Sequence, residues 1–165
     1  MKKKKRLTHA DAKGAAKMVD VSEKKVTERF ARAAGAIRMK PETLRAIERN
    51  SVAKGDVITV AKVAGIMAAK RTAELVPLCH PLPLSEIKVV LMLDQLLPGV
   101  RCEALVRTAG KTGVEMEAIT AVAVSLITVY DMAKALDKDM TIDDICLLEK
   151  AGGRSGHWRR IGRKT

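Results

Sequence analysis

Aromatic residues are scarce in this chain. Phe, Tyr and Trp make up 2% of its 165 residues, and they occur once each, as Phe30, Tyr130 and Trp158. Binding of nucleic acids by base stacking needs several aromatic platforms, so this mode of binding is disfavoured. Hydrophobic residues still make up 47% of the chain. The length and composition therefore indicate one compact domain with an aliphatic core.

Cysteines are also few and widely separated, at Cys79, Cys102 and Cys146. Without a Cys-x-x-Cys pair, neither a disulfide framework nor a zinc knuckle is indicated, and we expect no metal site. The longest apolar run, residues 118–130, is too short to cross a bilayer. No apolar stretch follows the basic N-terminus, as a signal peptide would require. We expect a soluble cytoplasmic protein with reduced thiols and no membrane partner.

Acidic residues are in deficit. Lys and Arg number 31 against 19 Asp and Glu, and the formal net charge is +12. A basic body favours a polyanionic partner, such as a phosphorylated metabolite, a nucleic acid or an acidic membrane. A nucleic-acid-binding module would interleave basic residues with aromatics or concentrate them on one recognition helix. Neither pattern is present, so we expect no nucleic-acid partner.

The first half of the chain predicts one strand and two helices. Mixed apolar and polar residues indicate a half-buried strand over residues 25–39. Pro41 opens a short helix over residues 41–50, and a second helix with a stripe of small residues follows over 56–73. Prolines make residues 76–84 a stiff extended loop.

The second half predicts strands over residues 86–93 and 100–108, an apolar helix over 113–136 and a strand over 142–150. Apart from one extra short helix, the order is β-α-β-β-α-β. This is the ferredoxin-like α+β arrangement, an antiparallel sheet with helices on one face.

Three segments are expected along the chain. Residues 1–22 form a mobile basic segment, residues 23–156 a single catalytic domain, and residues 157–165 a basic C-terminal tail. The opening run Lys2–Arg6 lacks apolar residues, and a solubilising role is favoured over nucleic-acid contact. We predict that this run is dispensable for activity.

A phosphate-binding turn is one candidate site. Gly110-Lys111-Thr112 resembles the end of a P-loop, but Leu105 stands where a Walker A motif needs glycine. A turn with Gly110 and Gly113 before a helix N-terminus could still bind phosphate. Plain helix initiation explains the same residues.

Titratable residues mark three further candidate sites. His80 lies between prolines, which would hold its imidazole in place, although a lone histidine often has no such role. Glu115 and Glu117 begin the long predicted helix, where acids also offset the helix dipole. Asp131 and Lys134 share a helix face near its other end, as an ordinary ion pair or as a site of perturbed protonation.

Taken together, the motifs resemble those of the cyclic pyranopterin monophosphate synthases. They are, in chain order, Met18-Val-Asp-Val-Ser22, Lys54-Gly-Asp-Val57, Ala64-Gly-Ile66, Ala68-Ala-Lys-Arg-Thr72, Pro77-Leu-Cys-His-Pro-Leu82, Thr112-Gly-Val-Glu-Met-Glu-Ala118, Tyr130-Asp-Met132, Lys138-Asp-Met140 and Gly152-Gly-Arg-Ser-Gly156. The match runs from about Leu7 to Gly156. Leu-Cys-His-Pro-Leu combined with Gly-Lys-Thr-Gly-Val-Glu-Met-Glu-Ala is specific to this family.

The resemblance implies a ferredoxin-like enzyme assembled as a homohexamer, a trimer of dimers with active sites at dimer interfaces. It implies that a lyase converts 3′,8-cyclo-7,8-dihydroguanosine 5′-triphosphate to cyclic pyranopterin monophosphate and pyrophosphate, an early step of molybdenum cofactor biosynthesis. No cofactor is required, although Mg²⁺ could accompany the triphosphate.

The same resemblance implies the roles of individual residues. Asp131, Lys54 and Lys134 are implied to be catalytic. The implied substrate contacts are Leu78, Cys79, His80, Glu115, Met116 and Glu117. A lysine in a basic, partly dry pocket would have a pKa lowered toward neutrality and could act as a base. Because Glu117 and Asp131 are far apart on one predicted helix, we also predict that two subunits share each site.

A nucleotide-binding or regulatory domain of the same fold is the remaining alternative. In such a domain Asp131, Lys134 and Lys54 would be dispensable. Incubation with the cyclised triphosphate distinguishes the two, because only the enzyme forms a pterin.

Overall fold

One antiparallel sheet holds all the strands in residues 15–161, which are the residues that the computed structural model describes. The strands are β1 (Thr27–Arg38), β2 (Leu84–Asp94), β3 (Gly99–Gly110), β4 (Thr141–Ala151) and β5 (Trp158–Arg159). Their order across the sheet is β2-β3-β1-β4-β5. The central strand β1 pairs with β3 along its whole length, from Thr27 opposite Gly110 to Arg38 opposite Gly99.

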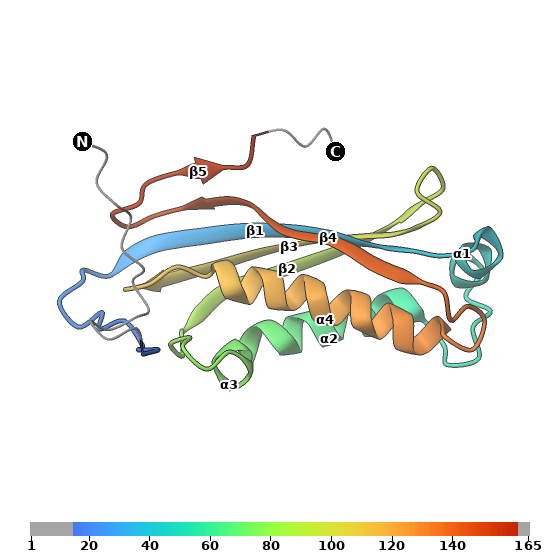
Figure 1. The fold of residues 1–165 in the computed structure, drawn as a ribbon, viewed down its shortest axis with the longest axis horizontal. Coiled ribbons are helices and arrows are strands. Elements are labelled where there is room, and N and C mark those ends of the chain that lie inside the picture. The colour runs from blue at the N-terminus through green and yellow to red at the C-terminus, as the bar shows by residue number, and fades with distance from the viewer. Residues whose placement is uncertain (1–14, 162–165) are drawn as a thin grey trace.

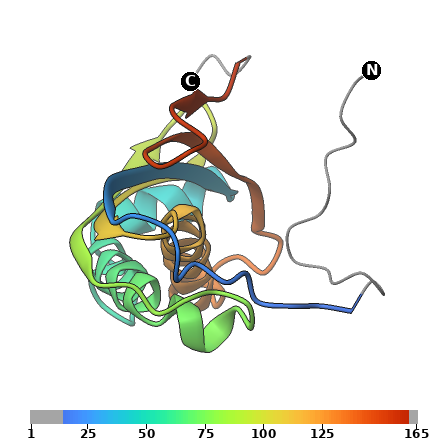
Figure 2. The same cartoon turned by 90° about the vertical axis from the view of Figure 1, so that its left-hand side faces the viewer.

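Two long helices cover one face of this sheet (Figures 1 and 2). The helices are α1 (Pro41–Glu48), α2 (Val57–Lys70), α3 (Thr72–Leu75) and α4 (Glu115–Ala133). Helix α4 packs against β1, β3 and β4, and α2 packs against α4 and β2. The order of elements and strands confirms the predicted ferredoxin-like α+β fold, with α1 as the extra short helix.

The strands are half-buried because their side chains alternate between the helices and the outer face. In β3, Val100, Cys102, Ala104 and Val106 are buried against the helices, and the residues between them are more exposed. This period of two is the geometry of an extended chain with one face in a core. The scarcity of aromatic residues is thus compatible with a continuous aliphatic core.

The two long helices approach each other closely at Gly65. A Cβ atom at this position would lie 2.1 Å from Ser125 Oγ and 2.8 Å from the carbonyl oxygen of Ala121. Only glycine allows this contact between α2 and α4. Helix α2 begins at Val57 after Asp56, whose side chain accepts a hydrogen bond from the Thr59 amide over 3.0 Å.

The structure differs from the sequence prediction at several boundaries. The helix predicted over residues 56–73 is interrupted at Arg71, where α2 ends and α3 follows. There the buried Thr72 hydroxyl donates to the carbonyl oxygens of Ala68 and Ala69, in competition with regular backbone bonding. Helix α4 ends at Ala133 rather than at residue 136.

The C-terminal residues were predicted as a tail, but Trp158–Arg159 form β5. This strand pairs with β4, with Trp158 opposite Lys150. The predicted extended loop before β2 begins with a turn, in which the Cys79 amide donates to the Val76 carbonyl over 3.0 Å. The run Lys2–Arg6 lies outside the described residues, and its predicted role stays a prediction.

Helix α4 is long and apolar enough, by length and composition alone, to cross a membrane, although its apolar run was expected to be too short. However, 56% of its apolar window is buried inside the fold. Leu126, Val122 and Val129 are fully buried. The apolar character of α4 is therefore explained by its packing against the sheet and against α2.

Candidate active site

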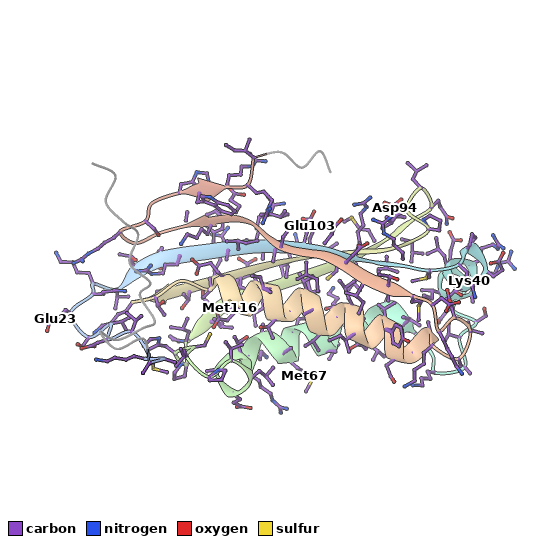
Figure 3. The ribbon with its side chains drawn as sticks, in the orientation of Figure 1. Glu23, Lys40, Met67, Asp94, Glu103 and Met116 are labelled. Carbon is purple, nitrogen blue, oxygen red and sulfur yellow. The ribbon has the colours of Figure 1, made fainter. Side chains whose placement is uncertain are left out.

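A cavity of 1210 Å³ lies at the end of the molecule where α4 begins, which faces the viewer in Figure 2. Four segments line it: residues within 19–30, the loop 76–82, the start of α4 with the turn before it, and residues 150–155. Figure 3 shows Glu23 and Met116 at this end. All the predicted substrate contacts line the cavity, namely Leu78, Cys79, His80, Glu115, Met116 and Glu117.

The loop that carries His80 is anchored at both ends. At its start the turn from Val76 to Cys79 is closed by a backbone hydrogen bond. At its end the Thr108 hydroxyl of β3 donates to the Pro83 carbonyl over 2.7 Å. The prolines at 77, 81 and 83 restrict the backbone between these anchors. The loop is therefore held in place before any ligand binds.

The thiol of Cys79 is not activated as a nucleophile. Burial raises its pKa above the ordinary value, and the carboxylate of Glu117 adds to the rise. A thiol whose pKa is raised is protonated near neutral pH, and the thiolate is the reactive form. Cys79 therefore shapes the cavity wall as a small polarisable side chain.

Glu117 is the most buried acid of the cavity, with 4% of its surface exposed. Burial raises the pKa of its carboxyl from 4.5 to about 7, and the charge of Glu115 adds to the rise. A group with this pKa can both donate and accept a proton at neutral pH. Glu115 is instead held in an ion pair, with Lys150 Nζ 2.6 Å from its Oε1.

Six basic side chains are among the residues that line the cavity. They are Lys24, Lys25, Arg29, Lys111, Lys150 and Arg154, and they come from the segment before β1, from β1 itself, from the turn after β3, from the end of β4 and from the turn after β4. We call these six residues the basic rim. Such a concentration of cations favours a polyanionic ligand.

Lys54, Asp131 and Lys134 meet in a second cluster outside this cavity. Lys54 Nζ lies 2.7 Å from Asp131 Oδ2, and Lys134 Nζ lies 2.6 Å from Asp131 Oδ1. Lys54 Nζ also donates to the carbonyl oxygen of Asp131 over 3.0 Å. The glycine turn before α2 thus brings Lys54 to the last turn of α4, a contact that the sequence did not predict.

The protonation of this cluster differs from the expectation. Hydrogen bonds from Lys134 and Lys54 lower the pKa of Asp131 to about 2, and the bond to Asp131 raises the pKa of Lys134. The expected lowering of a lysine pKa is therefore wrong for Lys134 in the isolated chain. About half of each side chain is exposed to solvent, and the hydrogen bonds affect the pKa values of Asp131 and Lys134 more than desolvation does.

The two clusters lie at opposite ends of α4. Glu117 and Asp131 both belong to this unbroken helix of 19 residues, and fourteen residues separate them. At about 1.5 Å per residue, the separation along the axis is about 21 Å. In Figure 1, α4 starts on the side of α3 and ends on the side of α1. Within one chain, the six predicted substrate contacts therefore lie together at the cavity. The three predicted catalytic residues lie together at the other end of α4.

Most of the basic rim was not predicted from the sequence. Lys111 was considered as part of a phosphate-binding turn, and Arg154 stands in one of the quoted motifs without a predicted role. Arg29 and Lys150 were not considered. Arg29 fits the alternating pattern of one predicted strand, and Lys150 stands at the end of another. The residues next to them in the sequence therefore give no indication of a binding role. Only the pairing of β1 with β3 and β4 brings them to one place.

The chain is similar to a large set of known proteins. The family model described as the MoaC family matches residues 18–153. A relative from Dinoroseobacter shibae is 60% identical over 152 residues, covering 92% of this chain and 96% of the relative. One from Thermomicrobium roseum is 59% identical over 154 residues, covering 93% of each, and one from a Methylobacterium species is 61% identical over 152, covering 92% and 95%. All three are named cyclic pyranopterin monophosphate synthase.

Proposed function

The chain belongs to the MoaC family, and on this premise we propose that it is a cyclic pyranopterin monophosphate synthase. It would convert 3′,8-cyclo-7,8-dihydroguanosine 5′-triphosphate to cyclic pyranopterin monophosphate, with release of pyrophosphate, in molybdenum cofactor biosynthesis. The observation that carries the proposal is the cavity, which is lined both by the Leu-Cys-His and Glu-Met-Glu motifs and by the six cations of the basic rim. A heterocyclic triphosphate has this same combination of a ring and a polyanion.

The reaction class follows from the product. A cyclic monophosphate forms when an internal hydroxyl attacks the α-phosphorus, so that one P–O bond forms while the bond to pyrophosphate breaks. No water enters this step, and the enzyme is a phosphorus–oxygen lyase. Cations near the leaving group stabilise the charge that develops on pyrophosphate.

Part of the cavity lining is suited to the purine-derived ring. Leu78, Cys79 and Met116 offer apolar and polarisable surface, while Glu117 and His80 offer hydrogen bonds. Rearrangement of the ring requires repeated proton transfers, and a carboxyl with a pKa of about 7 can take part in both directions. Glu117 therefore contacts the ring as a proton donor in one state and an acceptor in the other.

The basic rim is suited to the triphosphate. Its lysines and arginines can neutralise a charge of about −4 without any metal held by the protein. Among residues 15–161 no group of three His, Cys, Asp or Glu side chains could hold a metal ion. A Mg²⁺ ion that takes part would therefore be bound mainly by the phosphate oxygens of the substrate.

The Lys54–Asp131–Lys134 cluster would complete the site from a second chain. About 21 Å along α4 is too far for both ends of one helix to contact one small substrate. An antiparallel contact between two chains brings the start of one α4 near the end of the other. Such a dimer is the unit of the proposed homohexamer, a trimer of dimers.

Exposed apolar side chains on α2 support this assembly. Val60, Val63 and Met67 expose 44%, 49% and 48% of their surfaces on one helix. Figure 3 shows Met67 pointing away from the sheet. Contiguous exposed apolar residues of this kind mark contact surfaces between proteins.

The direct test is incubation of the purified chain with the cyclised triphosphate, with pterin and pyrophosphate followed separately. We expect both products in equal amounts. Binding of the substrate without turnover would contradict the proposal and would support a regulatory nucleotide-binding domain. Failure to bind the triphosphate would reject both functions.

A further inference from the structure

Arg29 connects segments of the cavity wall that are distant in the sequence. Its Nε donates to the Gly110 carbonyl over 2.9 Å, and its Nη2 donates to the Lys111 carbonyl over 3.2 Å. Both acceptors belong to the end of β3 and the turn that follows it. Two successive carbonyl groups are thus held by one planar guanidinium, which fixes the direction in which the turn leaves the sheet.

The same guanidinium lies against the glycine turn after β4. A Cβ atom at Gly153 would be 2.3 Å from Arg29 Nη1, and one at Gly152 would be 2.8 Å from Arg29 Cγ. Gly152 and Gly153 also have φ values of +108° and +67°. The turn, which carries Arg154, therefore packs directly on the Arg29 side chain, and its positive φ values favour glycine at both positions.

A third segment is tied to the same place through Lys111. Its Nζ donates to the Ser22 carbonyl over 2.7 Å and so holds the segment before β1 at the cavity. That segment contributes Lys24 and Lys25 to the basic rim. Because Arg29 fixes the backbone of Lys111, the position of this segment depends on Arg29 as well.

We propose that Arg29 is a positioning residue, which holds the turn after β3 and the turn after β4 so that the basic rim fits the polyphosphate part of the substrate. The inference rests on the proposed function for the identity of that substrate. Arg29 acts through the geometry of its fork rather than through its charge alone. Lysine, a point charge on a flexible stem, cannot reproduce two parallel hydrogen bonds and a packed planar surface.

The experiment measures the binding of inorganic tripolyphosphate by calorimetry, together with kcat and KM for the cyclised substrate. Arg29→Lys keeps the charge but loses the fork, and we expect tripolyphosphate binding to weaken roughly tenfold to a hundredfold. KM should rise by a similar factor, with kcat changed by less than about threefold. Arg32→Lys is the matched control on the same strand, where Arg32 instead contacts Glu103 and Glu149.

A second pair of variants tests the positioning role of Arg29 without changing Arg29 itself. Gly153→Ala would force Cβ against the guanidinium, whereas Gly156→Ala has a similar φ of +62° and no atom within 4 Å of the new Cβ. We expect Gly153→Ala to weaken tripolyphosphate binding as Arg29→Lys does, and Gly156→Ala to leave it unchanged. This pair decides the result if Arg29→Lys does not fold.

Several outcomes would overturn the proposal. Binding by Arg29→Lys as tight as that of the unaltered chain would show that charge alone matters, or that Arg29 has no role. Equal weakening in Arg32→Lys would indicate a general effect of strand β1. Tripolyphosphate binding requires no turnover, so a chain that binds it through Arg29 but forms no pterin would contradict only the proposed reaction.

Discussion

Glu115 and Glu117 lie on the same turn of α4, yet their surroundings give them different properties. Glu115 is paired with Lys150, while Glu117 is buried beside Cys79 and has a pKa of about 7. Sequence alone predicted both as substrate contacts and could not separate them, because both are also the acids expected at a helix start. The difference depends on which side chains pack around each carboxyl.

The raised pKa of Glu117 predicts a specific pH dependence of stability. Between about pH 4.5 and 7 the folded chain holds a proton that the unfolded chain has released, so the free energy of unfolding falls as pH rises through this range. Glu117→Gln has no carboxyl to ionise at this position, so it removes this fall in the free energy of unfolding. We expect Glu117→Gln to be more stable than the unaltered chain at pH 8, on the order of 1–3 kcal/mol, with the difference disappearing below about pH 4.5.

Urea unfolding at pH 8 and at pH 4 measures this effect. Glu115→Gln is the control, because it removes the ion pair with Lys150 and should not gain stability at pH 8. If Glu117→Gln were no more stable than the unaltered chain at pH 8, the carboxyl would already be adequately solvated or paired when charged.

The lysines at the other end of α4 are expected to serve catalysis and not the fold. Lys54 and Lys134 are about half exposed, and each forms an ion pair with Asp131 in the last turn of the helix. We predict that Lys54→Ala and Lys134→Ala each lose turnover by a factor of about 10² or more while the unfolding midpoint changes little. Lys62→Ala, at an exposed position of α2, is the control. Near-normal pterin production by both variants would reject the assignment.

At the scale of elements, the sequence predicted the strands and helices well because their patterns are local. The alternation in residues 100–108 and the helical spacing after Gly113 each depend on neighbours within a few residues. Strand β5 was missed because two residues among glycines and arginines show no period. The basic rim was missed because its members come from four segments that only the completed sheet brings together.

The loop before β2 offers a test of how an element positions the site. Thr108→Val keeps the shape of the side chain but removes the hydrogen bond to the Pro83 carbonyl. We expect a loss of about 1 kcal/mol in stability and a lower kcat/KM, because the loop that carries Leu78, Cys79 and His80 would be held less firmly. Thermal unfolding and steady-state kinetics check the two effects.

Thr141→Val is the matched control for the loss of a hydroxyl, because Thr141 is exposed where β4 begins and its hydroxyl donates only a long bond of 3.5 Å to the Asp139 carbonyl. It should change neither quantity appreciably. A Thr108→Val variant with reduced stability but normal kcat/KM would show that the prolines alone hold the loop.

At the scale of the whole molecule, the separation of the two clusters predicts that each site needs two chains. Glu117→Ala and Asp131→Ala should each be inactive alone. When the two variants are mixed under conditions that exchange subunits, some interfaces combine an intact start of α4 with an intact end. We expect about a quarter of the normal activity to return in an equal mixture, if the chains pair at random.

Exchange has to be demonstrated independently, for example by mass spectrometry of chains that differ in an affinity tag. A mixture of Glu117→Ala with Glu117→Gln is the negative control, because no interface then regains Glu117. Failure of the first mixture to recover activity after proven exchange would mean that each chain forms its site alone.

The position of Trp158 allows ligand binding at the cavity to be followed by intrinsic tryptophan fluorescence. It is the only tryptophan of the chain, it is 41% exposed, and on β5 it lies opposite Lys150 of β4. Lys150 in turn holds Glu115 at the cavity wall. Fluorescence excited at the indole therefore comes from one known place, next to a residue of the basic rim. Its emission spectrum can report polyphosphate binding and release of the C-terminal strand without any added label.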